Sequence, residues 1–94
     1  MYIYRLMSKP EFIHTKEVPN FNRKYKYFSP SLDFLFNRVL DGKFNNSNFK
    51  PERYTHLVCF KINKEDLKHF TKVGRKELQV SVRKTHLIRW KRIF

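Results

Sequence analysis

The sequence predicts an α+β fold: a small mixed or antiparallel sheet with two to three short helices, in the order β-α-β-α-β-α-β-β. One strongly helical segment lies among short segments rich in strand-forming residues, and no series of long helices is present that could cross over a parallel sheet. The chain has only 94 residues, so we expect residues 1–94 to form a single domain.

The start of the chain predicts a strand followed by a short helix. Residues 1–6 are rich in tyrosine and isoleucine, which favour strands. Ser8 is followed three residues later by Glu11, which is the spacing of a capping box at a helix start. Pro10 suits the first helical turn, because an N–H group there has no helical partner. We therefore expect a helix over residues 9–16.

The next segment predicts a second strand and the clearest helix of the chain. Residues 22–28 alternate charged and aromatic side chains, which favours a strand. Ser29 and Pro30 suit the N-cap and the first residue of a helix, and Gly42 suits its end. We expect this helix over residues 30–40. The apolar residues spaced as one buried helical face are Leu32, Leu35, Phe36, Val39 and Leu40.

The second half of the chain predicts three more strands and a short helix. Residues 54–62 contain a nearly continuous apolar run, which favours a strand at the centre of a sheet. A short helix is expected over residues 64–70. Residues 77–82 alternate apolar and polar side chains and predict a half-buried strand, and residues 88–94 predict the last one. The apolar members of the alternation are Leu78, Val80 and Val82.

Positive charge dominates the composition. Twenty-one Lys and Arg against eight Asp and Glu give a net charge of +13 and a pI near 10.2. Such an excess repels itself in a compact chain, and a polyanionic partner would neutralise it. Nucleic acid, or a nucleoprotein complex, is the first candidate, because Lys and Arg contacts to phosphates release condensed counterions. A membrane surface is not expected, since no long basic amphipathic helix is present.

The single cysteine indicates the compartment. Because Cys59 is the only cysteine, the chain cannot form an internal disulfide. This favours a reducing environment, for which we expect the cytoplasm. Its apolar neighbours, Val58 and Phe60, predict a buried and unreactive thiol. No apolar run approaches the ~18 residues that span a bilayer. Residues 1–10 lack the apolar stretch of a signal peptide.

Two clusters of basic residues are candidate nucleic-acid-binding sites. The first interleaves cations with Tyr25 and Tyr27, so that phosphates and bases could both be contacted; an ordinary strand with one solvated face explains it equally well. The second fills the C-terminal third. The candidate residues are Arg23, Lys24, Lys26, Arg75, Arg83, Lys84, Arg89, Lys91 and Arg92. No metal site is expected, because the four histidines are scattered and a single cysteine cannot supply a thiolate cluster.

Three parts of the chain, taken together, resemble the ADP-ribosyltransferase superfamily in its Arg-Ser-Glu form. Arg5 lies on the predicted first strand, as the arginine of that family does. Ser29 lies in an aromatic-Ser-x-Ser turn at 27–31 that leads into a helix. Glu77 lies on a later strand near the C-terminus. The resemblance covers nearly the whole chain, and it implies an α+β fold with NAD as the cofactor.

The resemblance also implies a role for each of these residues. Arg5 would hold NAD by bidentate hydrogen bonds to its pyrophosphate or nicotinamide ribose. Ser29 would orient the pocket, and Tyr27 or Phe36 would stack on the nicotinamide. Glu77 would be the catalytic residue: its carboxylate would hydrogen-bond the ribose and stabilise the positive charge that develops as nicotinamide leaves. We expect the acceptor to be nucleic acid or a nucleic-acid-associated protein.

Each of these residues also has an ordinary structural explanation. Arg5 could pair with an acid at a strand edge, Ser29 could cap a helix, and Glu77 could be a surface strand residue. Arg75 stands two residues before Glu77, where arginine-modifying members of the family carry Gln or Glu, so the resemblance implies another acceptor.

Two functions that involve no catalysis remain open. One is a nucleic-acid-binding or inhibitor protein that acts on a nucleoprotein complex through its basic surface. The other is a module that binds an acidic protein. Steeply salt-dependent binding to oligonucleotides would favour the first of these, whereas selective binding to an acidic protein would favour the second.

Overall fold

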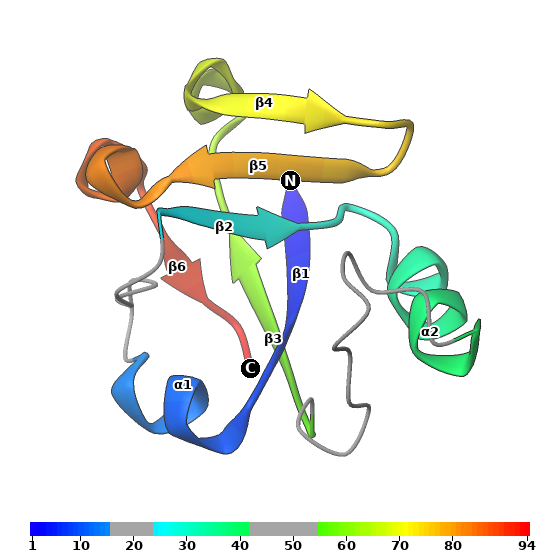
Figure 1. Cartoon of the computed structure of the whole chain (residues 1–94). Coiled ribbons are helices and arrows are strands. Elements are labelled where there is room, and N and C mark those ends of the chain that lie inside the picture. Colours follow the sequence, from blue (N-terminus) through cyan, green and yellow to red (C-terminus); the bar gives the residue numbers. More distant parts are fainter. Residues whose placement is uncertain (16–23, 42–54) are drawn as a thin grey trace.

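The computed structural model describes residues 1–15, 24–41 and 55–94, and the statements below concern those residues. Short helices separate most of the successive strands (Figure 1). In chain order the elements are β1 (Tyr2–Met7), α1 (Lys9–His14), β2 (Tyr25–Phe28), α2 (Leu32–Asp41), β3 (His56–Lys61), the 3-10 helix η2 (Lys64–His69), β4 (Phe70–Val73), β5 (Glu77–Ser81), the 3-10 helix η3 (Val82–Leu87) and β6 (Lys91–Arg92).

The strands form two antiparallel three-stranded sheets, with the orders β1-β3-β6 and β2-β5-β4. A single antiparallel bridge between Tyr4 and Ser29 connects β1 to the end of β2 and so joins the two sheets. The Tyr4 N–H donates to the Ser29 carbonyl at 2.7 Å, and the Ser29 N–H donates back to Tyr4 at 2.9 Å. The strands of one sheet run across those of the other (Figure 1). The predicted α+β class is confirmed.

The core lies where the two sheets face one another. Alternate residues of β1, β2, β3 and β5 project into it, as expected for strands with one buried face. Phe28 is central: its ring lies 6.1 Å from that of Phe60 and 5.3 Å from that of Trp90. The buried members are Ile3, Met7, Phe28, Val58, Phe60, Ile62, Leu78, Val80 and Ile88.

Several elements follow the sequence closely. The Ser8 hydroxyl accepts the N–H of Glu11 at 3.4 Å, so Ser8 caps α1 as predicted. β3 is the central strand of its sheet, and Leu78 and Val80 of β5 are buried in the core. A hairpin turn that begins at Gly74 joins β4 to β5. The φ angle of Gly74 is +72°, a backbone region that glycine adopts without strain.

The helix α2 differs from its prediction at both its start and its buried face. It begins at Leu32, and the Phe34 N–H donates to the Ser31 hydroxyl at 3.2 Å. Ser31 therefore caps the helix in place of Ser29, because Ser29 still pairs with Tyr4 of β1 and the helix begins only at Leu32. The expected burial of Phe36 is wrong: Leu35 is buried, but Phe36 is 45% exposed.

The C-terminal half contains more elements than predicted. Residues 70–73 form β4, which was not predicted, and the expected helix before it is the 3-10 helix η2. Between the strands expected over residues 77–82 and 88–94 lies the 3-10 helix η3, which begins at Val82, so Val82 is not a strand residue. The last strand is only Lys91–Arg92. Among the described residues, no helix is both long and apolar enough to cross a bilayer.

Candidate functional site

The segments that carry Arg5, Ser29 and Glu77 are neighbours in the structure. Arg5 lies on β1, Ser29 directly follows β2, and Glu77 is the first residue of β5. The bridge at Ser29 places the end of β2 beside Tyr4, which precedes Arg5 in the chain. β2 and β5 are paired along their length, with Phe28 opposite Leu78. The three segments therefore meet at the junction of the two sheets.

The side chain of Ser29 is completely buried and holds this junction together. Its hydroxyl accepts the N–H of Ser31 at 3.0 Å. The same hydroxyl can donate its hydrogen to the Lys76 carbonyl oxygen, which lies 2.5 Å away, or to the Ser31 carbonyl oxygen, which lies 3.1 Å away. Lys76 immediately precedes Glu77, so one serine connects the end of β2 to the start of β5. This hydroxyl therefore has a structural role, and its assignment to an NAD pocket stays a prediction.

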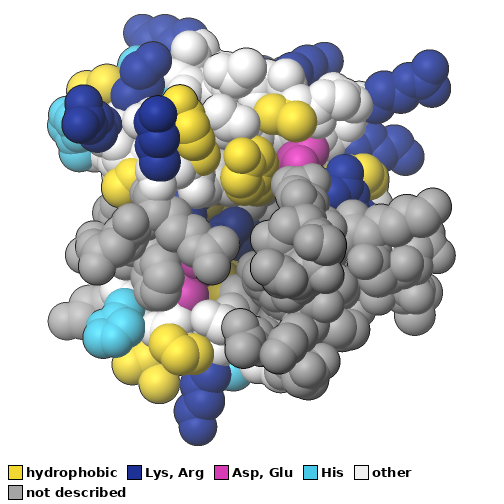
Figure 2. Space-filling view, in the orientation of Figure 1, with side chains coloured by type: hydrophobic (Ala, Val, Ile, Leu, Met, Phe, Trp, Pro, Cys, Tyr) yellow, Lys and Arg dark blue, Asp and Glu magenta, His cyan; other side chains and the backbone are white. Residues whose placement is uncertain are grey.

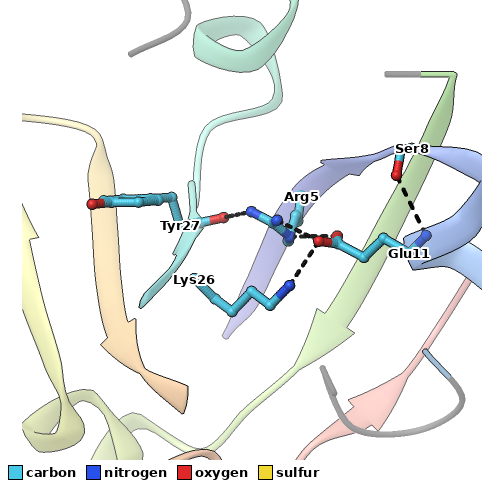
Figure 3. Close-up of polar contacts among 5 residues, drawn as sticks. All are labelled: Arg5, Ser8, Glu11, Lys26 and Tyr27. Atoms are coloured by element: carbon cyan, nitrogen blue, oxygen red, sulfur yellow. Dashed lines mark hydrogen bonds and ion pairs between the residues drawn. The ribbon is translucent and has the colours of Figure 1, made fainter. Parts of the chain in front are cut away.

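Arg5 is held in a buried ion cluster with Glu11 and Lys26 (Figure 3). Its guanidinium binds the Glu11 carboxylate in bidentate fashion, through Nε at 2.8 Å and Nη2 at 2.7 Å. Nη1 donates to the backbone carbonyl of Tyr27 on β2 at 3.0 Å. Lys26 Nζ donates to the same Glu11 carboxylate at 2.7 Å. The cluster thus links β1, α1 and β2.

The carboxylate of Glu11 carries a negative charge between two cations. Burial alone would raise the pKa of Glu11, because a charged carboxylate loses its hydration. Hydrogen bonds and charge attraction from Arg5, and then from Lys26, oppose this and leave the pKa of Glu11 below its ordinary value. The group is therefore held ionised in the interior, where it neutralises part of the charge of the two cations.

The Arg5 side chain, from β1, lies on one side of the β2–β5 pair, and the Glu77 side chain projects from the other. The Arg5 guanidinium lies 5.9 Å from the centre of the Phe28 ring, on the core side of β2. Leu78, which pairs with Phe28, also faces the core. Successive residues of a strand project to opposite faces, so Glu77 projects from the other side. Glu77 is only 4% exposed, which excludes the interpretation of this residue as a surface group.

The two candidate stacking residues lie on separate elements. Tyr27 is half-buried on β2, and its ring points away from the ion cluster (Figure 3). Phe36 is exposed on α2. The assignment of these two rings to a nicotinamide pocket stays a prediction.

Most of the candidate nucleic-acid-binding residues are on the surface, as predicted for cations that meet a polyanion. Figure 2 shows Lys and Arg side chains projecting along the upper rim of one face, around the β2-β5-β4 sheet, where Asp and Glu occupy little of the surface. The exposed candidates are Lys24, Arg75, Arg83, Lys84, Arg89 and Lys91. Arg23 lies outside the described residues.

The assignment of Lys26 to the surface is wrong. Its side chain is buried completely and forms the ion pair with Glu11, because even-numbered residues of β2 face the core. Arg92 is half-buried: its guanidinium lies 4.8 Å from the centre of the Phe12 ring, and Nη1 donates to the Thr15 carbonyl at 2.9 Å. Lys26 and Arg92 thus have structural roles.

Glu11 is the residue of this site that sequence reasoning missed. The capping box drew attention to it as a helix-start residue, yet its side chain bonds to Arg5 and Lys26. A signal was present, since Glu11 is one of only eight acids in a chain with 21 cations. An acid among so many cations is expected to be held by them, but its partners could not be named without the fold.

Cys59 is buried, as predicted, and burial raises the pKa of its thiol despite a hydrogen bond with Tyr4 that acts in the opposite direction. The structure places no cluster of three or more metal-ligating side chains within the ranges it describes.

Comparison with family models, curated proteins and solved structures found no match to this chain.

Proposed function

We propose that this chain is a small ADP-ribosyltransferase-like domain that uses NAD and modifies nucleic acid or a nucleic-acid-associated protein in the cytoplasm. One observation supports the proposal: the three segments of the resemblance meet at one junction. Ser29 bonds through its backbone to Tyr4, beside Arg5, and through its hydroxyl to Lys76, beside Glu77. Residues far apart in the sequence are therefore assembled by a single serine.

The residues present suit NAD in part. Ser29 fits the role of orienting a pocket, because its hydroxyl fixes β5 against the end of β2. The bidentate face of Arg5 is occupied by Glu11, so Arg5 does not present that face to a pyrophosphate. We therefore assign Arg5 to positioning: it holds β1 against the Tyr27 carbonyl of β2.

Glu77 is the residue to which we assign the chemistry. NAD, when bound, supplies the ADP-ribosyl group and nicotinamide as the leaving group. The Glu77 carboxylate would hydrogen-bond the ribose and would stabilise the positive charge that develops there, a form of electrostatic stabilisation that is strong where water is excluded. The burial of Glu77 at the start of β5 favours this role.

Glu77→Gln is expected to lower the rate of transfer about 10²–10³-fold while the protein still folds. The substitution keeps the shape of the side chain and removes its charge, and loss of one charge-stabilising group typically lowers a rate by about 10²–10³-fold. The wild type and the variant are incubated with NAD labelled in its adenylate part, together with RNA, DNA or a basic protein. Incorporated label and released nicotinamide are measured.

Glu65→Gln is the matched control, because Glu65 is an exposed acid on η2, which lies at the end of β4 opposite the turn that leads to Glu77, and transfer should be unchanged. Thermal unfolding of both variants checks that the fold is kept. The proposal is abandoned if wild-type protein releases no nicotinamide, transfers no label and shows no thermal shift with NAD.

A second candidate function, nucleic-acid binding without catalysis, is favoured by the distribution of charge. Glu11, Asp66 and Glu77 are buried, so their charges lie in the interior. Most of the described Lys and Arg side chains are exposed. The surface is therefore more cationic than the composition alone suggests, which favours a polyphosphate partner over an uncharged one.

This second function predicts steeply salt-dependent binding to a mixed-sequence oligonucleotide. With three phosphate contacts or more, the affinity should fall about 40-fold or more for a duplex, and about 18-fold or more for a single strand, between ~50 and ~200 mM salt. Arg89→Glu with Lys91→Glu should weaken binding alike for every sequence tested. Fluorescence anisotropy measures both effects. Weak or salt-independent binding, with selective binding to an acidic protein instead, would favour the interaction-module function.

A further inference from the structure

The beginning of β2 and the beginning of η3 form one exposed surface. The N–H of Val82, the first residue of η3, donates to the Lys24 carbonyl at 3.1 Å. Tyr25 pairs with Ser81, the residue that precedes η3. The two basic clusters seen in the sequence, one near residue 24 and one in the C-terminal third, therefore meet here.

An exposed aromatic ring lies beside a cation on this surface, close to the start of η3. Tyr25 is 37% exposed, and Lys24 Nζ lies 5.5 Å from the centre of its ring. Arg83 and Lys84, in the first turn of η3, are exposed, and that turn contains no acidic residue. We call Lys24, Tyr25, Arg83 and Lys84 the Tyr25 surface.

We infer that the Tyr25 surface binds single-stranded nucleic acid, with a base stacked on Tyr25 and neighbouring phosphates on Lys24, Arg83 and Lys84. A tyrosine ring can stack on any base, and cations that flank it meet the backbone on either side. A duplex is a poorer ligand, because its bases are already stacked on one another. This binding site rests on the proposed function only because both take nucleic acid as the ligand. What it adds is the position on the surface where the nucleic acid binds.

The test measures binding in the absence of NAD, so that its failure leaves the transfer experiment unaffected. Labelled single strands of DNA and RNA of about 12 nucleotides, a duplex of the same sequence and heparin are titrated with protein at low salt. Tyr25→Ala should weaken single-strand binding about 5- to 150-fold, the usual contribution of one stacked base, and leave heparin binding unchanged. Tyr25→Phe should retain the binding.

Tyr2→Ala is the matched control, since Tyr2 is also exposed and also lies beneath a lysine, Lys61, at 5.9 Å. It should leave single-strand binding within about twofold of wild type. Arg83→Glu with Lys84→Glu should weaken single strands and heparin alike, because both ligands are polyanions. Equal effects of Tyr25→Ala and Tyr2→Ala, or a duplex bound as tightly as a single strand, would overturn the inference.

Discussion

Glu11→Gln is expected to lower the free energy of unfolding by about 3–5 kcal/mol, the range seen when one partner of a buried ion pair is removed. The amide that replaces the carboxylate cannot neutralise the two cations it contacts, so Arg5 and Lys26 lose this counter-charge in the interior. Urea unfolding followed by circular dichroism measures the loss. Glu65→Gln makes the same chemical change at an exposed position and should alter stability by less than ~0.5 kcal/mol.

The same carboxylate gives the wild type a characteristic dependence on pH. Because the folded pKa of Glu11 is lowered, the unfolded chain binds the proton more readily. The stabilisation is therefore fully present above the ordinary glutamate pKa of about 4.3 and is lost as the pH falls through the lower folded value. Glu11→Gln should show a shallower loss of stability in acid than the wild type. If the free energy of unfolding falls with pH to the same extent in both proteins, Glu11 is not the group responsible for this pH dependence.

Phe28→Ala is expected to destabilise the protein by about 3–5 kcal/mol, because it removes a large ring from the centre of the core and leaves a cavity. Phe28 is 1% exposed and packs against Phe60, Phe70 and Trp90, so the loss affects contacts from both sheets. Trp90 is the single tryptophan of the chain, and its fluorescence reports the unfolding transition directly.

Phe36→Ala is the matched control for this prediction. Phe36 is 45% exposed, so the same truncation should change stability by less than about 1 kcal/mol. If Phe28→Ala fails to fold, Phe28→Leu keeps most of the apolar volume and should lower stability by a smaller, measurable amount. Equal losses for Phe28→Ala and Phe36→Ala would contradict the assignment of Phe28 to the core.

The sequence by itself determined the α+β class and several of its elements. The alternation of Leu78 and Val80 predicted the buried face of β5, and the apolar run around Val58 predicted a central strand. The Ser8 cap predicted the start of α1. These features could be predicted because periodicity and capping are local properties, set by neighbours a few residues away.

The candidate site was predictable in its members but not in its geometry. The sequence named Arg5, Ser29 and Glu77, and the fold brings their segments to one junction. It could not show that Glu11 occupies the bidentate face of Arg5, because those two residues meet only through the packing of α1 beside β1. Nor could it show that Lys26 is buried, since that depends on which face of β2 meets the core.

Only the tertiary structure decided which strands pair and which charges are buried. β4 was missed because its residues are mostly exposed and show no buried face, and pairing with β5 across the hairpin makes it a strand. Lys24, Tyr25 and η3 are likewise brought together by the β2–β5 pairing. The physical reason is the same in each case: a sequence pattern reports what a side chain favours, whereas pairing and burial depend on distant segments that supply the missing partner.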